Sequence, residues 1–256
     1  MGLRESFELR GRVALVTGGS RGLGLQIAKG LGEMGAKIAV SARKAQELAA
    51  AKEELAAQGI DVLTVVNDLS KPEQIPSLVS AVVDHFGGID ILVNNAGATW
   101  GARAEDHPLE GWNKVMALNA TGVFALSQAV AKSCFIPKRS GNVIVVASTA
   151  ALRTGMHMNA AAYFASKAAA LHLTRALACE WGPYGIRVNA ICPGFFPSKM
   201  ASGLLSTIEP EVIARTPLGR IGGDTDLQGA AVFLASDASR HVTGQYIAVD
   251  GGASSA

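Results

Sequence analysis

The stretch TGGSRGLG, residues 17–24, joins an apolar run to a helical pattern and decides the fold that this sequence predicts. The run at 11–19 is typical of a buried strand that ends in glycines. Residues 23–35 have apolar positions at helical spacing and end at Gly35, a residue suited to a helix C-cap. Glycines in such a turn let the backbone approach a pyrophosphate, which the helix N-terminus attracts. The stretch therefore favours a dinucleotide site over a plain tight turn.

Strand-like and helix-like segments alternate along the rest of the chain. The pattern predicts strands within 11–19, 36–43, 60–69, 89–97, 141–148, 185–194 and 244–252, and helices within 23–35, 44–59, 72–87, 112–137, 160–181 and 226–236. Such alternation is the signature of parallel βαβ units. We therefore predict an α/β, single-domain Rossmann fold with a seven-stranded, parallel, doubly wound sheet and helices on both faces. Without an internal linker or repeat, residues 1–256 form one domain, with a small substrate lid near 197–215.

Composition excludes several classes of protein. Of 256 residues, 49% are hydrophobic and 17% charged, which fits a well-packed globule with a net charge of +2. The absence of a basic run argues against nucleic acid, and the absence of a long apolar run argues against a membrane span. Residues 1–11 lack the apolar core of a signal peptide. An odd count of three cysteines, without metal-ligand spacing, predicts buried thiols, no metal and a cytoplasmic protein.

Charge next to the second predicted strand indicates which dinucleotide is preferred. A carboxylate at the end of that strand would bind a ribose 2′-hydroxyl, but Ala42 stands there and Arg43 follows. Arg21, in the glycine-rich turn, adds a second guanidinium suited to phosphate. We expect NADP(H), with NAD(H) possible, although Arg43 is also consistent with a solvated helix start. Asp68 fits either an adenine contact or a helix N-cap.

Four motifs in this order give the chain a family resemblance: TGGSRGLG, NNAG at 94–97, YFASK at 163–167 and PG at 193–194. With them the chain resembles the classical short-chain dehydrogenase/reductase (SDR) family over nearly its whole length. The resemblance implies an NADP(H)-dependent oxidoreductase. It maps the family's catalytic residues onto Asn119, Ser148, Tyr163 and Lys167.

The resemblance leaves the catalytic hydroxyl with two candidates. Thr149 follows Ser148, and the segment up to Tyr163 is about two residues longer than is common in the family. Counting from Gly141, at the start of the preceding strand, favours Ser148. The extra length then falls in 153–159.

Tyr163 and Lys167 stand four residues apart in a helical pattern, so they share one face. A free phenol has a pKa of about 10, and a nearby ammonium stabilises the phenolate. We therefore expect Lys167 to lower the pKa of Tyr163, which would exchange the proton with the substrate oxygen. The resemblance implies that Ser148 binds that oxygen, and that Asn119 holds a water linking Lys167 to solvent. An isolated pair of this kind would more simply be an amphipathic helix edge.

The glycine-rich turn and the resemblance together predict a set of cofactor contacts. Ser198 stands where family members have a threonine near the nicotinamide carboxamide, and Lys167 would also bind the nicotinamide ribose. The full predicted set is Gly18, Ser20, Arg21, Gly22, Leu23, Gly24, Arg43, Asp68, Leu69, Asn95, Ala96, Gly97, Tyr163, Lys167, Pro193, Gly194, Phe196 and Ser198.

The sequence identifies the substrate less precisely than it identifies the cofactor. Within the family the chain looks most like bacterial 3-oxoacyl-carrier-protein reductases and gluconate 5-dehydrogenases, so a 3-oxoacyl or similar ketone reductase is expected. The alternatives are a sugar-acid or other alcohol dehydrogenase and, from another class, a non-catalytic dinucleotide sensor. An acyl-carrier-protein substrate would require a basic patch, for which the candidates are Arg103, Arg153, Lys199 and Arg215. Expected pocket walls are Trp100, 155–159, Phe195, Phe196 and 199–215, with His157 in a surface loop. Family members pair helices such as 112–137 and 160–181, so a homotetramer is expected.

Overall fold

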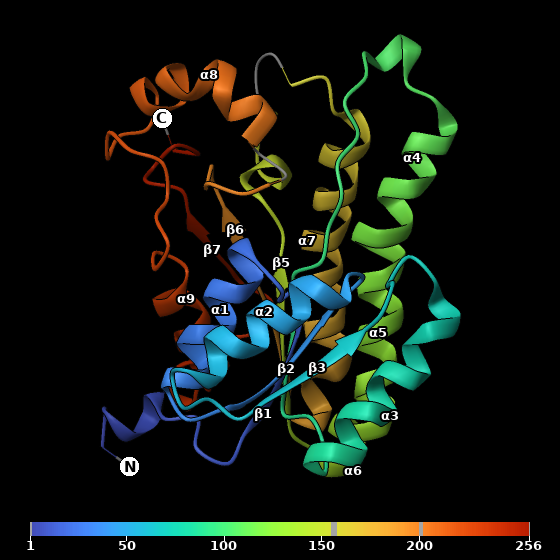
Figure 1. Cartoon of the computed structure of the whole chain (residues 1–256), viewed down its shortest axis with the longest axis vertical. Coiled ribbons are helices and arrows are strands. Elements are labelled where there is room, and N and C mark those ends of the chain that lie inside the picture. Colours follow the sequence, from blue (N-terminus) through green and yellow to red (C-terminus); the bar gives the residue numbers. More distant parts are fainter. Residues whose placement is uncertain (1, 155–157, 200–201, 256) are drawn as a thin grey trace.

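A single parallel sheet forms the centre of the molecule. The computed structural model describes residues 2–154, 158–199 and 202–255. Within them the chain forms seven strands in the spatial order β3-β2-β1-β4-β5-β6-β7 (Figure 1), and every neighbouring pair is parallel. Their bounds are β1 Val13–Thr17, β2 Lys37–Ala42, β3 Val62–Val66, β4 Ile91–Asn94, β5 Gly141–Val146, β6 Ile186–Pro193 and β7 Tyr246–Val249. The predicted seven-stranded parallel sheet is confirmed.

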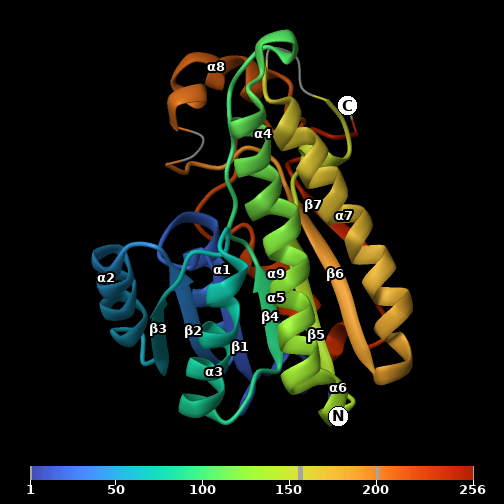
Figure 2. The ribbon, with the colours of Figure 1, turned by 90° about the vertical axis from the view of Figure 1, so that its right-hand side faces the viewer.

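Helices cover both faces of this sheet (Figures 1 and 2), as the doubly wound prediction requires. One layer, of α1, α2 and α9, packs on one face, and a second layer, of α3, α5 and α7, packs on the other. Alternate residues of β1 serve the two layers: Leu15 faces the second, and Val16 faces the first. The helix bounds are α1 Gly22–Glu33, α2 Ala45–Ala56, α3 Ile75–Phe86, α4 Leu109–Met116, α5 Val123–Val130, α6 Ile136–Lys138, α7 Ala161–Trp181, α8 Ser202–Ala214 and α9 Gln228–Ala235.

The strand order places a crevice between β1 and β4. From β1 the chain proceeds outward to β2 and β3, then returns to add β4 on the other side of β1. The connections that follow β1 and β4 therefore diverge, and a cleft opens where their carboxyl ends meet. The glycine-rich turn follows β1, and NNAG begins at the last residue of β4. The topology thus brings two of the sequence motifs to one point.

The helix predicted at 112–137 starts earlier and is not uniform. It begins at Leu109 in α4, immediately after the extended Pro108. Leu109 is 77% exposed, so the apolar pattern did not mark this first turn. Wider π turns at Ala117–Gly122 and Ala131–Phe135 interrupt the α-helix. The first of these turns contains Asn119, which is buried.

The predicted lid segment contains a helix that the sequence pattern did not indicate. Residues Ser202–Ala214 form α8, even though Pro210 lies inside it and cannot donate a backbone hydrogen bond. Glycine, serine and proline hid the helical periodicity in this stretch. In both ribbon views α8 lies beyond the carboxyl ends of the strands, on the same side as the amino-terminal end of α7 (Figures 1 and 2).

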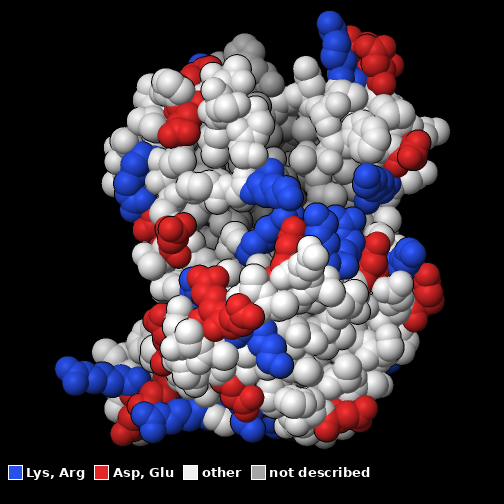
Figure 3. All heavy atoms as spheres, in the orientation of Figure 1, with Lys and Arg blue, Asp and Glu red and all other residues white. Residues whose placement is uncertain are grey.

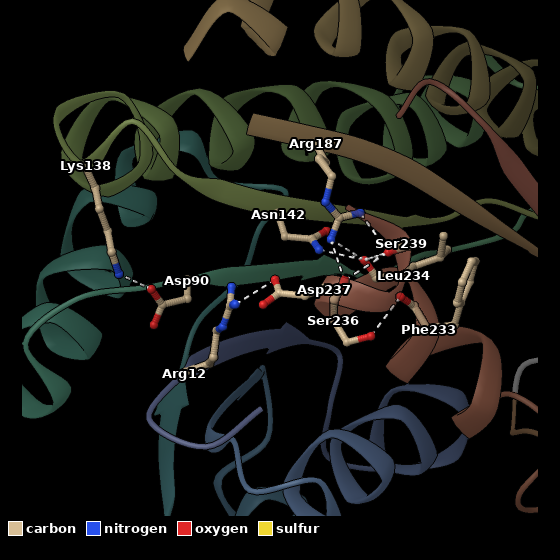
Figure 4. A network of polar contacts seen from close by, with 10 residues as sticks. All are labelled: Arg12, Asp90, Lys138, Asn142, Arg187, Phe233, Leu234, Ser236, Asp237 and Ser239. Atoms are coloured by element: carbon tan, nitrogen blue, oxygen red, sulfur yellow. Dashed lines mark hydrogen bonds and ion pairs between the residues drawn. The ribbon is translucent and has the colours of Figure 1, made fainter. Parts of the chain in front are cut away.

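Polar contacts tie the opposite, amino-terminal end of the sheet together (Figure 4). Arg187, at the start of β6, donates to the carbonyl oxygens of Leu234 and Ser236 at 2.9 and 3.1 Å, and to Ser239 Oγ at 2.9 Å. Asn142, at the start of β5, donates to the same Leu234 carbonyl at 2.6 Å. This network anchors the turn after α9 far from the crevice.

Candidate active site

The glycine-rich turn has the backbone geometry of a phosphate cradle. Gly18 has φ +63° and Gly22 has φ +54°, a region that glycine adopts without steric cost. A Cβ on Gly18 would lie 3.0 Å from the Cα of Ala96, and a Cβ on Gly24 would lie 2.4 Å from Asn95 Nδ2. The turn therefore needs glycine both for its conformation and for its close approach to the loop after β4.

NNAG holds that turn in place. Asn95 Nδ2 donates to the carbonyl oxygens of Thr17 and Gly18 at 2.8 and 3.2 Å. The Thr17 hydroxyl accepts from the backbone N–H groups of Asn95 and Ala96, both at 3.0 Å. Asn94 donates to Ser127 Oγ of α5 at 2.9 Å, so it ties β4 to the helix behind it. These side chains support the crevice.

A groove of about 1190 Å³, its open mouth included, runs from this turn to α7. With the exception of Pro193, Gly194 and Phe196, all predicted cofactor residues line it. Asp68 is not the N-cap of the next helix, because Lys71 holds that position; its Oδ1 instead accepts from Ser70 N and Oγ within a turn. Burial acts to raise the pKa of Asp68, but these hydrogen bonds and nearby Arg43 lower it overall, so the groove carries a carboxylate there.

The three exceptions support the groove from behind. Phe196 is 4% exposed, and its ring lies so close to Gly222 that a Cβ there would be 2.3 Å away. The backbone N–H of Gly194 donates to the carbonyl oxygen of Val249, in β7, at 3.0 Å, and a Cβ on Gly194 would meet Asp250 at 2.8 Å. Phe196 is therefore a core residue and not part of the groove lining.

Sequence reasoning missed part of the lining. The two most informative omissions are Glu47, in the first turn of α2, and Lys199, directly after Ser198. Their signal in the sequence was proximity along the chain to Arg43 and Ser198. The other residues outside the predicted set are Ser41, Ala42, Lys44, Asn67, Leu118, Val146 and Ala147.

Basic side chains gather at the hollow of the molecular surface (Figure 3). Those that line the groove are Arg21, Arg43, Lys44 and Lys199. Glu47 lies among them: its Oε1 is 2.8 Å from Arg21 Nη1 and 3.5 Å from Lys44 Nζ. Positive charge thus exceeds negative charge where the second strand ends, which suits an anionic ligand.

Tyr163 and Lys167 lie at the other end of the groove, one turn apart on α7. Lys167 is only 6% exposed, and its Nζ donates to the Val146 carbonyl at 2.8 Å. That ammonium is 5.7 Å from the centre of the Tyr163 ring. The Ser148 side chain interacts with the Tyr163 hydroxyl and acts to lower the pKa of that tyrosine. The pair is therefore not a solvated helix edge.

The expected lowering of the Tyr163 pKa is wrong for the chain by itself. Burial raises the pKa of Tyr163 above 10, and the hydrogen bond from Ser148 offsets only part of that effect. Burial also lowers the pKa of Lys167 to about 8, against the opposing influence of the nearby Cys192 thiol. Desolvation is the largest cause of both shifts in pKa. At neutral pH Tyr163 is thus a protonated phenol beside a mostly charged lysine.

The Asn119 side chain is fully engaged with protein. Its Oδ1 accepts from Ala98 N at 2.8 Å, while its Nδ2 donates to Ala98 O and to Ser166 Oγ, both at 2.9 Å. Ser166 in turn donates to the Tyr163 carbonyl. A Cβ on Gly97 would be 3.4 Å from Asn119 Oδ1 and 3.5 Å from Lys167 Nζ, so Asn119 borders the lysine. The amide atoms of Asn119 join the loop after β4 to the catalytic helix.

The structure separates the two candidate hydroxyls. Ser148 has an extended backbone, accepts from Ala150 N at 3.1 Å and contacts Tyr163. Thr149 instead begins the short 3₁₀ helix Thr149–Ala151. Ser148 is therefore the hydroxyl next to the phenol, as counting from Gly141 indicated.

The residues expected around the substrate are less tightly grouped. Trp100 packs its indole on Gly111, where a Cβ would be 2.7 Å away, and His157 lies outside the described residues. Among the candidate basic residues for a carrier protein, Arg103 pairs with Glu105 at 2.7 Å, and Arg215 pairs with Glu211 at 3.0 Å. Lys199 lines the cofactor groove instead.

Known proteins match this chain over nearly its whole length. The family model for enoyl-(acyl carrier protein) reductase matches residues 18–254. The chain is 39% identical over 252 residues to gluconate 5-dehydrogenase of Gluconobacter oxydans, covering 97% of this chain and 96% of that protein. It is 40% identical over 253 residues to the rhamnolipids biosynthesis 3-oxoacyl-[acyl-carrier-protein] reductase of Pseudomonas aeruginosa, covering 96% of this chain and 97% of the relative.

A solved structure extends the likeness to three dimensions. Gluconate 5-dehydrogenase from Burkholderia cenocepacia, in complex with NADP and tartrate, superposes with a TM-score of 0.93 at 35% identity over 100% of both chains. The chain belongs to the short-chain dehydrogenase/reductase family. It is an oxidoreductase that acts on CH–OH donors and the corresponding carbonyl compounds. Among the described residues, no helix has the length and apolar character needed to cross a membrane.

Proposed function

We propose that the protein transfers a hydride between NADP(H) and a ketone or secondary alcohol, with Tyr163 as the acid/base. The observation that carries this proposal is the place of Tyr163 and buried Lys167 at the end of a dinucleotide-sized groove, where the lysine Nζ lies 5.7 Å from the centre of the tyrosine ring. The Ser148 side chain interacts with the Tyr163 hydroxyl at the same place. In the sequence, Ser148 belongs to a different segment from the helix that holds Tyr163 and Lys167. Their meeting at the carboxyl end of the sheet fits acid/base chemistry on a single substrate oxygen.

The residues present fit a dinucleotide. A cradle that only glycine can form lies at the amino end of α1, and cations border the far end of the groove. A bound nicotinamide supplies the hydride; the chain supplies the remaining functions. Gly18 and Gly22 let backbone N–H groups reach phosphate oxygens, and Lys167 binds ribose hydroxyls.

The proton is handled by the chain itself. In the reducing direction Tyr163 gives its hydroxyl proton to the carbonyl oxygen, and Ser148 donates a hydrogen bond to that oxygen as charge develops on it. Lys167 stabilises the resulting phenolate by its positive charge. Asn119 positions the loop after β4 against α7 through its contacts with Ala98 and Ser166. The raised pKa of Tyr163 makes this side chain a proton donor at rest, which favours carbonyl reduction.

NADP(H) is the proposed cofactor, with NAD(H) as a weaker substitute. No carboxylate stands at the end of β2, and Arg43 and Arg21 line the groove near it. A 2′-phosphate would gain charge-assisted hydrogen bonds there. The crystal structure of the similar Burkholderia cenocepacia enzyme contains NADP.

For the substrate we propose a 3-oxoacyl thioester or a similar ketone, with or without an acyl-carrier protein. The similarity to the Pseudomonas aeruginosa reductase supports this class. A gluconate-type sugar acid is the second candidate, because the similar enzyme crystallised with tartrate carries that name. The pairing of Arg103 and Arg215 with acidic neighbours gives the first candidate no continuous basic patch from those residues.

Three coarser features complete the proposal. The segment near 197–215 serves as a small substrate lid, supported by the place of its helix α8 beyond the strand ends (Figure 1). Leu109, Trp112 and Phe124 expose 77, 36 and 42% of their surface on α4 and α5, which supports a homotetramer built through these helices. The expectation that all three thiols are buried is wrong, because Cys192 is buried but Cys179 is exposed. Free Cys134, Cys179 and Cys192 support a reducing, cytoplasmic location.

The test is a substrate panel with both cofactors. Wild-type protein and Tyr163→Phe are assayed with NADPH and NADH against an acetoacetyl thioester, 5-ketogluconate and gluconate, while NADPH binding is followed by fluorescence. We expect turnover by the wild type and a loss of about 10²–10⁴-fold in Tyr163→Phe, with NADPH affinity nearly intact. Retained activity in the variant would remove Tyr163 from the chemistry. Binding of NADPH without turnover by the wild type on any substrate would support the dinucleotide sensor.

A further inference from the structure

The cationic end of the groove contains an acidic side chain that the cofactor preference does not explain. Arg21, from the glycine-rich turn, and Lys44, from the N-cap of α2, both approach the same oxygen of Glu47, at 2.8 and 3.5 Å. The Glu47 side chain is 26% exposed, and all three residues line the groove. Without Glu47, the two cations would face the groove with no acidic partner between them.

The place of the ion-pair cluster of Arg21, Lys44 and Glu47 in the fold indicates its role. In dinucleotide-binding folds the residues that follow the second strand meet the adenosine ribose, and they read its 2′ substituent. Arg21, Lys44 and Glu47 all lie next to that strand end, together with Arg43. A 2′-phosphate would be attracted to Arg21 and Lys44, but these two side chains already pair with Glu47. The negative charge of the Glu47 carboxylate would also repel the phosphate. An uncharged 2′-hydroxyl does not compete with Glu47 for the cations, and the carboxylate does not repel it.

We infer that Glu47 is a specificity-determining residue that opposes the 2′-phosphate and so moderates the preference of this enzyme for NADP(H) over NAD(H). The inference rests on the proposed function, because it concerns the same groove. Glu47 competes with the phosphate for Arg21 and Lys44, whereas Arg43 remains on the side of Asp68. Both cofactors therefore bind, and the affinity for NADP(H) is higher than the affinity for NAD(H).

The experiment compares Glu47→Gln with the wild type. Dissociation constants are measured for NADPH and NADH, and by competition for adenosine 2′,5′-bisphosphate and adenosine 5′-phosphate, which isolate the 2′-phosphate from the nicotinamide. We expect Glu47→Gln to tighten NADPH and the bisphosphate about three- to tenfold and to change NADH less than about twofold, because exposed ion pairs are individually weak. The gain should shrink at high salt.

Glu53→Gln is the matched control, because Glu53 lies on the same helix, is exposed and does not line the groove. It should leave all four constants unchanged. An unchanged NADPH-to-NADH ratio in Glu47→Gln would overturn the inference. So would a selective loss of NADH affinity, which would mean that Glu47 holds the ribose hydroxyls.

A separate variant distinguishes failure of the inference from failure of the proposed cofactor. Arg43→Asp should weaken NADPH much more than NADH if the groove reads a 2′-phosphate. Equal losses for both cofactors would refute the proposed NADP(H) preference, whatever Glu47→Gln does. A selective NADPH loss in Arg43→Asp, combined with an unchanged ratio in Glu47→Gln, would refute only the role of Glu47.

Discussion

Among single residues, Lys167 is the group whose protonation state most directly limits the proposed reaction. Its pKa is lowered by burial to about 8, whereas burial raises the pKa of Tyr163. Below about pH 8 the lysine is charged and the phenol holds its proton, so ketone reduction should be constant. As pH rises through 8, Lys167 loses its charge before Tyr163 loses its proton, and kcat/KM with NADPH and a ketone should fall. A pH profile between about 6 and 10 measures this.

Lys167→Arg identifies the titrating group. An arginine keeps its charge throughout this range, so whatever activity remains should no longer decline near a pH of about 8. The same decline in wild type and variant would assign the titration to another residue.

The two adjacent hydroxyls make a second residue-scale prediction. Ser148 contacts Tyr163, whereas Thr149 starts a 3₁₀ turn. Ser148→Ala should reduce kcat by about 10²–10³-fold, because a donor to the developing oxyanion is lost. Thr149→Ala should stay within roughly threefold of the wild type under the same assay. Equal effects of the two substitutions would contradict the assignment of Ser148, and not Thr149, as the catalytic hydroxyl.

At the scale of elements, the start of α1 is bound to the loop after β4 through glycine. A Cβ on Gly24 would lie 2.4 Å from both Asn95 Nδ2 and the Gly18 carbonyl, so one of them must move. Gly24→Ala should therefore weaken NADPH binding and lower the free energy of unfolding by about 1–3 kcal/mol. Fluorescence titration and urea unfolding measure the two effects.

Gly229→Ala is the matched substitution, because Gly229 is also near the start of a helix, α9, and a Cβ added there would meet no atom within 4 Å beyond its chain neighbours and its own helix backbone. Alanine should be neutral there or stabilise by up to about 1 kcal/mol, through helix propensity. A loss in Gly229→Ala as large as that in Gly24→Ala would show that steric contact is not the cause.

The helix after Pro108 is interrupted by a π turn that the sequence pattern did not predict. The π turn Ala117–Gly122 lies between α4 and α5, and it contains the buried Asn119. Sequence periodicity located this helix but not the turn, because a one-residue widening leaves the apolar pattern nearly unchanged. The contacts from Asn119 to Ala98 and Ser166 exist only once α4 and α7 pack together.

For the whole molecule, the Arg187 network and the proposed catalytic residues lie at opposite ends of the sheet. Arg187 makes its hydrogen bonds at the amino-terminal end (Figure 4), whereas Tyr163 lies at the carboxyl end. Arg187→Met should lower the free energy of unfolding by about 2–4 kcal/mol, because several buried acceptors lose their donor. At temperatures where the variant stays folded, kcat/KM should change less than about twofold. Urea unfolding and steady-state assays test both parts.

Arg240→Met serves as its control, because Arg240 is exposed and directly follows the same turn after α9. It should change the free energy of unfolding by less than about 0.5 kcal/mol. If Arg187→Met were equally mild, the network would not be a main support of this end of the sheet.

The sequence by itself determined the parts of this protein that depend on local pattern. Alternating apolar runs and helical periodicity predicted all seven strands, and TGGSRGLG placed glycines where positive φ and close approach require them. The motif resemblance located Asn119, Ser148, Tyr163 and Lys167. The sequence pattern did not predict helix α8, because Gly203 and Pro210 interrupt its helical periodicity. These features are set by neighbours along the chain.

Only the tertiary structure decided the strand order, the Glu47 ion pairs and the electrostatics of the catalytic pair. A charge of opposite sign four residues away predicted a lowered pKa for Tyr163, but burial among side chains from distant segments raised it. In the same way, Arg21 and Glu47 are 26 residues apart in sequence and 2.8 Å apart in space. Desolvation and ion pairing depend on which segments surround a group, and that is fixed only when the sheet and its helices come together.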